Sequence, residues 1–323
     1  MRVDFRAVEE LAPGPRWAEL FRALWPSYRA YFLREGDEAR PGYLSSLRAL
    51  RQHMPELVSL YERLVELAGG GDAGARFLSL YRPTPYLTGC SQAVWTRGEP
   101  FLVRNYDYSP ALWEGLLLHT AWHGRRVIAM SDCLWGVLDG MNEAGLSVSL
   151  AFGGRKVVGD GFGTPLVLRY VLEFCESTAE ATHVLERVPV HMAYNVTVLD
   201  AQGDFRTLYL APDHPAVVLE RPFATNHQRA VEWEQHAAAT GSVDRERLLD
   251  HHLGDPRETA ERFADRFLEP PLFAADHARG WGTLYTAVYD PGARRAVYRW
   301  PGRACPQSFE DFSELGLALS FPG

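Results

Sequence analysis

The chain has 323 residues, 46% of them hydrophobic and 23% charged, with a formal net charge of -8. This composition is typical of a globular protein with one large domain or two average ones, and the acidic balance lacks the basic footprint of a nucleic-acid-binding protein. The N-terminal sequence MRVDFRAVEELAPGPRWAEL has no apolar signal region, and no apolar run reaches about 18 residues, so we expect a cytoplasmic protein without a membrane span.

Residues 1–75 are predicted to be helical. In PRWAELFRALWPSYRAYFL, the apolar residues from Trp17 to Tyr28 recur at spacings of three and four, and Pro26 is expected to kink or split this helix. A second periodic segment ends in a glycine cluster, which is a natural helix stop. The best candidate for a linker is the segment of Gly70, Gly71, Asp72 and Gly74.

From Phe77 onward, short apolar runs between turn residues predict β-strands. The first seven runs are FLSLY, YLTGCSQAVW, FLVRNYDY, LLLHTAW, RRVIAMS, LWGVLDGMN and GLSVSLAF. Helical periodicity follows in TPLVLRYVLEFCESTAEATHVLERV, strands return in YNVTVLDAQGDFRTLYLA, residues 229–268 are again helical, and TLYTAVYDPGARRAVYRW forms a closing hairpin. Consecutive strands with short turns favour antiparallel sheets, so we predict an α+β sandwich of sheets covered by helices.

Cys90 directly follows Gly89 in the strand-like run YLTGCSQ, and Arg104 and Asp107 occur in the next run. A free cysteine usually packs in a protein core. If the two runs pair, however, the guanidinium could stabilise a thiolate, and the carboxylate could accept a proton or orient an amine. The alternative is an Arg104–Asp107 ion pair that closes a strand end, and the spacing alone does not decide between the two.

Two further polar segments have ordinary structural interpretations. In GMNEAGL, the residues Asn142, Glu143 and Gly145 predict a hairpin turn. In ATNHQ, the Asn226 side chain could donate a hydrogen bond to a developing oxyanion. Taken by itself, this second cluster favours a polar turn in which Thr225 or Asn226 caps the following helix.

The sequence gives no support for a metal or a cofactor. His119 and His123 are spaced i, i+4, but LLLHTAWHGRR is typical of a strand and turn, and the HExxH glutamate is missing; His251 and His252 are merely adjacent. The GxGxxG, GxxxxGK[ST] and GxSxG motifs are also missing, which excludes the usual dinucleotide, P-loop and serine-hydrolase signatures. The four cysteines are far apart, which argues against a disulfide scaffold.

Four motifs follow one another along the chain: TGC with RNYD, then DGMNEAGL, then TNH, then the terminal TLYTAVYDPGARRAVYRW. This order resembles the acyl-CoA:6-aminopenicillanate acyltransferase family of N-terminal-nucleophile (Ntn) hydrolases and, more distantly, the choloylglycine and penicillin V hydrolases. The resemblance runs from about Tyr86 to about Arg299. It implies a four-layer αββα fold. Residues 1–89 would be a helical propeptide that stays attached, and residues 90–323 the catalytic segment.

The resemblance further implies that the protein cuts its own Gly89–Cys90 bond, which leaves Cys90 with a free α-amine. Because an α-amine has a pKa of about 7.7–8.0, it can act as the general base for the thiol of the same residue. Carried over by position, Arg104 would support the thiolate, Asp107 would hold the α-amine, and Asn226 would donate to the oxyanion.

Two parts of the family pattern are not matched by a clear side chain. Ala151 stands where the choloylglycine branch often has Asn or Tyr, so only a backbone N–H could act there as a second oxyanion donor. This departure weakens an assignment as a bile-salt hydrolase. The family also uses an arginine from the C-terminal half, for which the candidates are Arg279, Arg294, Arg295 and Arg299.

The predicted function is therefore a self-processing cysteine amidohydrolase or acyltransferase that acts on a small N-acylated compound through an acyl-Cys90 intermediate. The sequence does not decide whether acyl-CoA is a substrate or whether the protein forms a homo-oligomer. The aromatic residues of segment 101–113 and Trp135 could line an acyl pocket, although a sheet core is favoured. The alternatives are an enzyme of the same fold that is never cleaved and a non-catalytic protein that binds acyl ligands.

Overall fold

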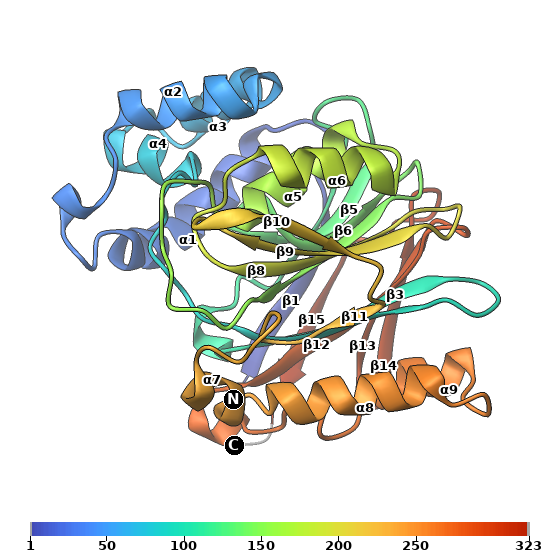
Figure 1. Ribbon diagram of the computed structural model, residues 1–323. Coiled ribbons are helices and arrows are strands. Elements are labelled where there is room, and N and C mark those ends of the chain that lie inside the picture. The colour runs from blue at the N-terminus through green and yellow to red at the C-terminus, as the bar shows by residue number, and fades with distance from the viewer. Residues whose placement is uncertain (1, 322–323) are drawn as a thin grey trace.

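The computed structural model describes residues 2–321, in which two β-sheets are stacked between layers of helices (Figure 1). One sheet has nine strands in the order β10-β9-β8-β7-β6-β5-β4-β1-β15, and the other has six in the order β11-β2-β3-β12-β13-β14. Every pair of neighbouring strands is antiparallel except β1 and β4. The predicted α+β fold with an αββα sandwich is confirmed.

The strands have the following bounds. The nine-stranded sheet contains β1 (Arg2–Glu9), β4 (Leu116–Thr120), β5 (Val127–Asp132), β6 (Gly136–Asn142), β7 (Ser147–Phe152), β8 (Tyr194–Leu199), β9 (Phe205–Ala211), β10 (His214–Leu219) and β15 (Leu315–Ser320). The six-stranded sheet contains β2 (Gly89–Trp95), β3 (Phe101–Tyr108), β11 (Phe223–Ala224), β12 (Gly282–Asp290), β13 (Arg295–Trp300) and β14 (Arg303–Ser308).

Helices cover both outer faces of the sandwich (Figure 1). The nine-stranded sheet is covered by α5 (Thr164–Phe174) and α6 (Thr178–Arg187), and the six-stranded sheet by α7 (Glu234–Ala239), α8 (Ser242–Gly254) and α9 (Ala260–Arg266). A further group at the N-terminal side comprises α1 (Pro15–Phe32), α2 (Tyr43–His53), α3 (Val58–Leu67) and α4 (Asp72–Leu78). The helical segments predicted near residues 164–188 and 229–268 are confirmed.

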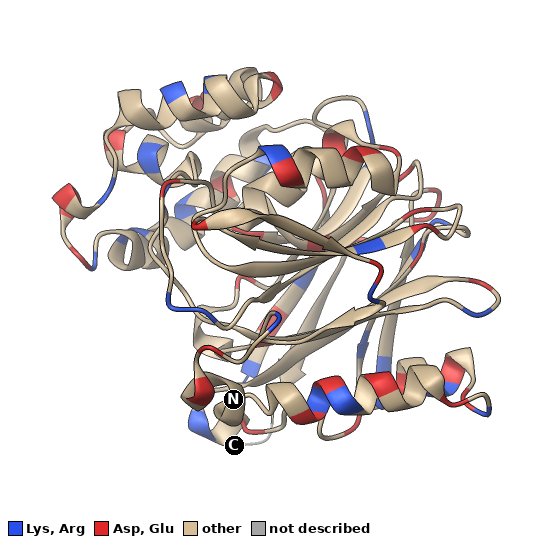
Figure 2. Ribbon diagram, viewed as in Figure 1, with Lys and Arg blue, Asp and Glu red and all other residues tan. Residues whose placement is uncertain are grey.

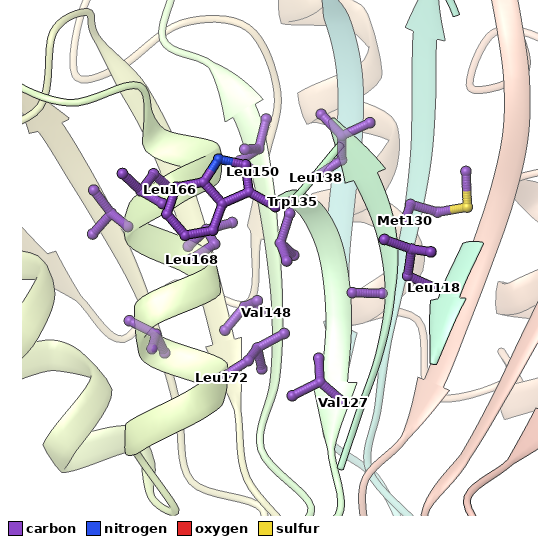
Figure 3. Packing of buried hydrophobic residues seen from close by; sticks show 14 of the residues in the cluster. Leu118, Val127, Met130, Trp135, Leu138, Val148, Leu150, Leu166, Leu168 and Leu172 are labelled. Carbon is purple, nitrogen blue, oxygen red and sulfur yellow. The ribbon is translucent and has the colours of Figure 1, made fainter. Parts of the chain in front are cut away.

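The apolar core lies between α5 and the nine-stranded sheet and continues into the space between the sheets. Leu168 and Leu172 of α5 are fully buried and lie near Val148 of β7 (Figure 3). Trp135 is also fully buried, and its indole N–H donates a hydrogen bond to the carbonyl of Leu78 at 3.0 Å. Trp135 is therefore a core residue, as the sequence favoured.

The predicted turn at residues 142–145 joins β6 to β7. Gly145 has a φ of +87°, and a Cβ at this position would lie 2.6 Å from the carbonyl oxygen of Pro291. Only glycine meets both conditions without strain. The Asn142 side chain accepts a hydrogen bond from the backbone N–H of Leu146 at 3.0 Å, which closes the turn. The structural interpretation of this motif is confirmed.

The prediction that residues 1–75 are entirely helical is wrong at its beginning, because Arg2–Glu9 forms β1. This strand lies between β4 and β15 and so belongs to the nine-stranded sheet. Val3, Phe5 and Ala7 alternate with more polar residues, which is the period of a strand and not of a helix. Phe5 is fully buried, and its ring centroid lies 5.1 Å from that of Trp300.

Three other local predictions need correction. The run FLSLY is not a strand, because α4 extends to Leu78. The glycine cluster is not a linker between domains, since Asp72 begins α4 and Gly74 is buried within it. Pro26 does not split the first helix, because α1 continues from Pro15 to Phe32. In each case, packing of the N-terminal helices against one another overrides a local signal.

Charged residues lie mainly on the helices and loops that surround the two sheets (Figure 2). Helix α8 carries charges of both signs along its length (Figure 2). Within residues 2–321, no helix is both long enough and apolar enough to cross a membrane.

Replacing Phe5 with alanine tests whether β1 is integral to the fold. Because Phe5 is fully buried beside Trp300, the substitution leaves a cavity, and we expect the free energy of unfolding to fall by about 3 to 5 kcal/mol. Asp4→Ala changes an exposed residue of the same strand and is the matched control, with an expected change within about 0.5 kcal/mol. Urea denaturation measures both, and equal small losses would contradict a structural role for β1.

Candidate active site

Pairing of β2 with β3 places Cys90 beside Arg104. Cys90 lies opposite Tyr106, and Gln92 lies opposite Arg104. Because side chains alternate along a strand, these four residues share the face of the six-stranded sheet that is turned toward the other sheet. Arg104 Nη2 donates a hydrogen bond to Cys90 Sγ at 3.3 Å, and both side chains are fully buried.

The buried charge of Arg104 is balanced by Asp139 of β6, in the opposite sheet. The guanidinium forms an ion pair with this carboxylate, and its Nη1 also lies 3.1 Å from the hydroxyl of Tyr285. The hydroxyl groups of Tyr285 and Tyr289 donate to the same carboxylate. The Asp139 carboxylate therefore accepts hydrogen bonds from both tyrosines and from Arg104. Its ion pair holds the Arg104 guanidinium in place beside Cys90.

Asp107 points to the other face of β3, toward helix α8. Its Oδ1 accepts a hydrogen bond from Thr283 Oγ1 at 2.7 Å, and its Oδ2 accepts one from Arg245 Nη1 at 2.9 Å. The alternative of an Arg104–Asp107 ion pair is therefore wrong, because residues separated by three positions lie on opposite faces of a strand. Asp107 instead forms its ion pair with Arg245.

The side chain of Asn226 lies directly at the backbone of Cys90. Its Oδ1 accepts hydrogen bonds from the Cys90 backbone N–H at 2.9 Å and from Arg245 Nη2 at 2.8 Å. Its Nδ2 donates to the carbonyl oxygen of Phe152 at 3.1 Å and lies 3.5 Å from that of Thr88. Two donors on one side and carbonyl oxygens on the other define the orientation of this amide.

The segment that carries Asn226 is held by buried polar contacts. Asn195 of β8 donates through Nδ2 to the carbonyl oxygens of Thr225 and His227, which flank Asn226. The Asn226 backbone N–H donates to Ser242 Oγ, at the start of α8, at 2.8 Å. The prediction that Thr225 or Asn226 caps the next helix is wrong, because α7 begins only at Glu234.

Gly89 leaves no room for a side chain. A Cβ at this position would lie 2.8 Å from the Trp281 ring and 3.2 Å from the Asp107 Cβ. A Cβ at the first distance would force a shift, since such contacts are essentially never seen. The Cα of Gly89 is thus closely packed against the Trp281 ring and the Asp107 side chain of the neighbouring strand.

Burial raises the pKa of the Cys90 thiol, and the nearby Arg104 only partly opposes this effect. The thiol is therefore mostly protonated near neutral pH and needs a base to become a nucleophile. Its side-chain hydrogen-bond partners in the described chain are Arg104 and Thr88, neither of which is a base at this pH. Burial also lowers the pKa of the nearby His236, to about 4, so that this imidazole is neutral.

Arg245 is the site residue that the sequence analysis missed. The four arginines considered before lie elsewhere: Arg279 pairs with Asp276, Arg299 pairs with Asp265, and Arg294 and Arg295 lie in and just after the turn between β12 and β13. Arg245 and Leu249 are both buried on one face of α8, four residues apart. The signal for this residue in the sequence was its spacing of four residues from Leu249, which places Arg245 on the apolar face of the predicted helix.

Ala151 lies in β7 next to Phe152, the residue whose carbonyl oxygen accepts from Asn226. The two histidines spaced i, i+4 bind different acidic residues: His119 lies 2.9 Å from Glu9, and His123 lies 3.7 Å from Glu173. Over residues 2–321, no group of three or more His, Cys, Asp or Glu residues is placed to hold a metal ion.

The fold and this site define a protein of the Ntn-hydrolase class, an αββα sandwich with a cysteine near the start of strand β2. The family model described as acyl-coenzyme A:6-aminopenicillanic acid acyl-transferase matches residues 95–304. The chain belongs to this family, whose members are amidohydrolases and acyltransferases of small N-acyl compounds. The matched region includes Arg104, Asp107 and Asn226 but begins after Cys90.

Solved structures of three Ntn-hydrolase relatives are also similar. Penicillin V acylase from Agrobacterium tumefaciens is 14% identical with a TM-score of 0.47, over 68% of this chain and 86% of that chain. The Caenorhabditis elegans N-acylethanolamine-hydrolyzing acid amidase ortholog is 18% identical with a TM-score of 0.44, over 63% and 93%. A mutant of conjugated bile acid hydrolase from Clostridium perfringens is 12% identical with a TM-score of 0.40, over 72% and 97%. A search of curated proteins gave no match.

Replacing Arg245 with methionine tests whether this arginine holds the site together. Asp107 would lose its only ion-pair partner in the described chain while staying buried, so we expect the free energy of unfolding to fall by about 3 to 5 kcal/mol. Arg247→Met, two residues along α8, removes an exposed ion pair with Asp244 and should change it by less than about 1 kcal/mol. Similar values for the two variants in urea denaturation would argue against the proposed role of Arg245.

Proposed function

We propose that this protein is a self-processing cysteine Ntn-hydrolase that cleaves the linear amide bond of a small N-acylated compound through an acyl-Cys90 intermediate. One observation carries this proposal. Cys90 follows a glycine that has no space for a side chain, its Sγ lies 3.3 Å from Arg104, and its backbone nitrogen lies 2.9 Å from Asn226 Oδ1. A cysteine that only packs in a core would not need Arg104 at its sulfur or Asn226 at its backbone nitrogen.

Maturation would begin when Cys90 Sγ attacks the carbonyl carbon of Gly89. The new C–S bond replaces the C–N bond, and the Cys90 nitrogen takes up the thiol proton and becomes an amine. Water then hydrolyses the thioester, which restores the thiol and leaves Gly89 with a free carboxylate. The process needs no cofactor.

After cleavage, the α-amine of Cys90 would be the base that the thiol lacks in the intact chain. The amine accepts the thiol proton, the sulfur attacks the substrate carbonyl, and the amine then returns the proton to the leaving nitrogen. Water releases the acyl group from Cys90. Another amine or a thiol such as that of coenzyme A would instead complete an acyl transfer.

The contacts of the site suggest a role for each polar residue. Arg104 stabilises negative charge on Cys90 Sγ, because its Nη2 already donates to this atom. Asn226 holds the Cys90 nitrogen through Oδ1, and we assign its Nδ2, which lies 3.5 Å from the Thr88 carbonyl oxygen, as the donor to the developing oxyanion. Asp107 acts through Arg245, which it pairs with, and so positions Asn226.

Residues 1–89 would stay bound after cleavage. Strand β1 is hydrogen-bonded between β4 and β15, and α1 places Trp17 and Phe21 in the main core. Separating this piece would expose the apolar surface and unpaired strand edges, which is costly. We therefore expect one compact particle with two chains.

Intact-mass measurement of the purified protein tests self-processing. We expect the wild type to yield two fragments, residues 1–89 and 90–323, that co-elute in native gel filtration. Cys90→Ala should stay at full length, because it lacks the nucleophile. Cys175→Ala removes another buried cysteine and should be processed like the wild type.

The same samples test catalysis. Incubation of processed protein with p-nitrophenyl phenylacetate should add one acyl mass to the 90–323 fragment, and hydroxylamine should remove it, as expected for a thioester. A wild type that stays at full length and takes up no acyl group would overturn the proposal and favour a binding protein on this scaffold. A full-length protein that is acylated at Cys90 would favour an uncleaved enzyme.

Gly89→Ala tests whether the enclosed glycine is required for cleavage. The added Cβ would lie 2.8 Å from the Trp281 ring, and overpacking of this kind costs about 1 to 3 kcal/mol. An increase of this size in the barrier to cleavage would slow processing about 5- to 150-fold. The double variant Gly89→Ala, Trp281→Ala removes the clashing ring and should recover part of the rate. Time-resolved mass spectrometry after refolding measures both rates, and unhindered cleavage of Gly89→Ala would contradict this interpretation.

A further inference from the structure

His227 directly follows Asn226 and has no role in the chemistry assigned above, yet it is only 8% exposed. Its Nδ1 lies 2.8 Å from Ser242 Oγ, and its Nε2 lies 2.7 Å from Glu246 Oε2. The other carboxylate oxygen of Glu246 is paired with Arg221. A buried imidazole ring whose two nitrogens both contact polar side chains is held in one orientation by the surrounding network.

The direction of these hydrogen bonds is set by the groups at the two ends. A carboxylate only accepts, so Nε2 of a neutral His227 ring carries the proton, and Nδ1 is left as an acceptor for the Ser242 hydroxyl. At the other end, the backbone N–H of Asn226 only donates, and Ser242 Oγ accepts from it at 2.8 Å. The result is one continuous chain of hydrogen bonds from the Asn226 backbone to the Glu246 carboxylate.

Glu246 anchors the outer end of this chain of hydrogen bonds. Burial raises the pKa of its carboxyl group, but the contacts with His227 and Arg221 outweigh burial and hold this pKa below its usual value, so Glu246 is ionised near neutral pH. Its side chain is 17% exposed and that of Arg221 is 35% exposed, so this end reaches the protein surface. The chain of hydrogen bonds thus runs from the surface to Asn226, the residue that contacts the Cys90 nitrogen.

Ser242 is the first residue of α8, a place where a serine hydroxyl often caps the free N–H groups of its own helix. Here all hydrogen-bond partners of the hydroxyl that lie within residues 2–321 belong to the segment of residues 225–227. They are the Asn226 N–H, His227 Nδ1 and Thr225 Oγ1. The fully buried Ser242 side chain therefore holds this segment and does not cap its own helix.

The backbone of Asn226 needs such support because residues 225–233 form neither helix nor strand. Asn195 binds the carbonyl oxygens on either side of Asn226, and Ser242 binds its N–H. The Asn226 side chain in turn accepts from the Cys90 backbone N–H at 2.9 Å. A misplacement of about 1 Å near reacting atoms can cost roughly 100-fold in rate. The precision of this contact therefore depends on side chains from neighbouring elements.

We propose that Ser242 and His227 are positioning residues for the reaction at Cys90. Ser242 fixes the backbone of Asn226. His227, which is held by Glu246, orients the Ser242 hydroxyl. The inference rests on the proposed function, in which Asn226 is the donor to the developing oxyanion. Because both residues act through that donor, their loss should lower the rate of the chemical step more than it weakens substrate binding.

Amide hydrogen exchange, followed by NMR in the full-length Cys90→Ala protein, tests the positioning without catalysis. The N–H of residue 90 is bonded to the Asn226 side chain, whereas the Val94 N–H, in the same strand, is bonded to the Pro222 carbonyl at 2.7 Å. Adding Ser242→Ala should speed exchange at residue 90 at least tenfold and leave Val94 within twofold. Equal changes at the two amides, or no change at residue 90, would overturn the inference.

Turnover of p-nitrophenyl phenylacetate by processed protein supplies the second readout. In Ser242→Ala and in His227→Phe, kcat should fall at least tenfold while KM changes less than threefold. His227→Asn keeps an acceptor close to the place of Nδ1 and should recover most of the lost kcat, which a role in packing alone would not do. If Ser242→Ala does not fold, His227→Phe takes its place in both assays.

Ser177→Ala and His252→Phe are the matched controls, because Ser177 caps α6 and His252 lies in the last turn of α8. Both should leave kcat within twofold of the wild type. A loss of kcat in Ser242→Ala that is no larger than in Ser177→Ala would overturn only the inference. A wild type that is neither processed nor acylated would overturn only the proposed function, and exchange at residue 90 would still decide the positioning role.

Discussion

The buried guanidinium of Arg104 is the constraint around which the rest of the site is arranged. A charge in this position between two sheets would be strongly destabilising without compensation. Asp139 from the opposite sheet supplies the counter-charge, and two tyrosine hydroxyls complete the carboxylate's hydrogen bonds. The remaining face of the guanidinium is directed at Cys90 Sγ. The stacking of the two sheets is therefore also what holds the Arg104 guanidinium beside the Cys90 thiol.

The N-terminal segment is part of the sandwich and not an appendage to it. Strand β1 fills a place inside the nine-stranded sheet, and α1 contributes to the core. A cut at Gly89–Cys90 would consequently change the chemistry of Cys90, by freeing its nitrogen, while the surrounding packing stays in place. The matured site would then depend on the two pieces staying together.

The sequence predicted much of the architecture because periodicity is a local property. The strand runs after FLSLY, the turn at Gly145, the helices over residues 164–187 and the closing hairpin all appear where apolar spacing and turn residues placed them. Failures came where packing decided, as in α4, whose FLSLY run is apolar enough for a strand, and at Pro26 inside α1. The apolar residues of β1 alternate with more polar ones, as in a strand. This short segment was nevertheless grouped with the longer helical segments that follow it.

For the site, the sequence by itself determined that Cys90 and Arg104 lie in consecutive strand-like runs joined by a short turn, while the contact between the two side chains followed from the register of β2 and β3. The structure then showed that Asp107 faces away from Arg104, as the two-residue period of a strand requires, and pairs with Arg245. Only the tertiary structure decided which groups meet Cys90 from elsewhere. Asn226 and Arg245 reach the site through long-range packing of β8 and α8, and no local pattern records which distant side chain fills a buried position.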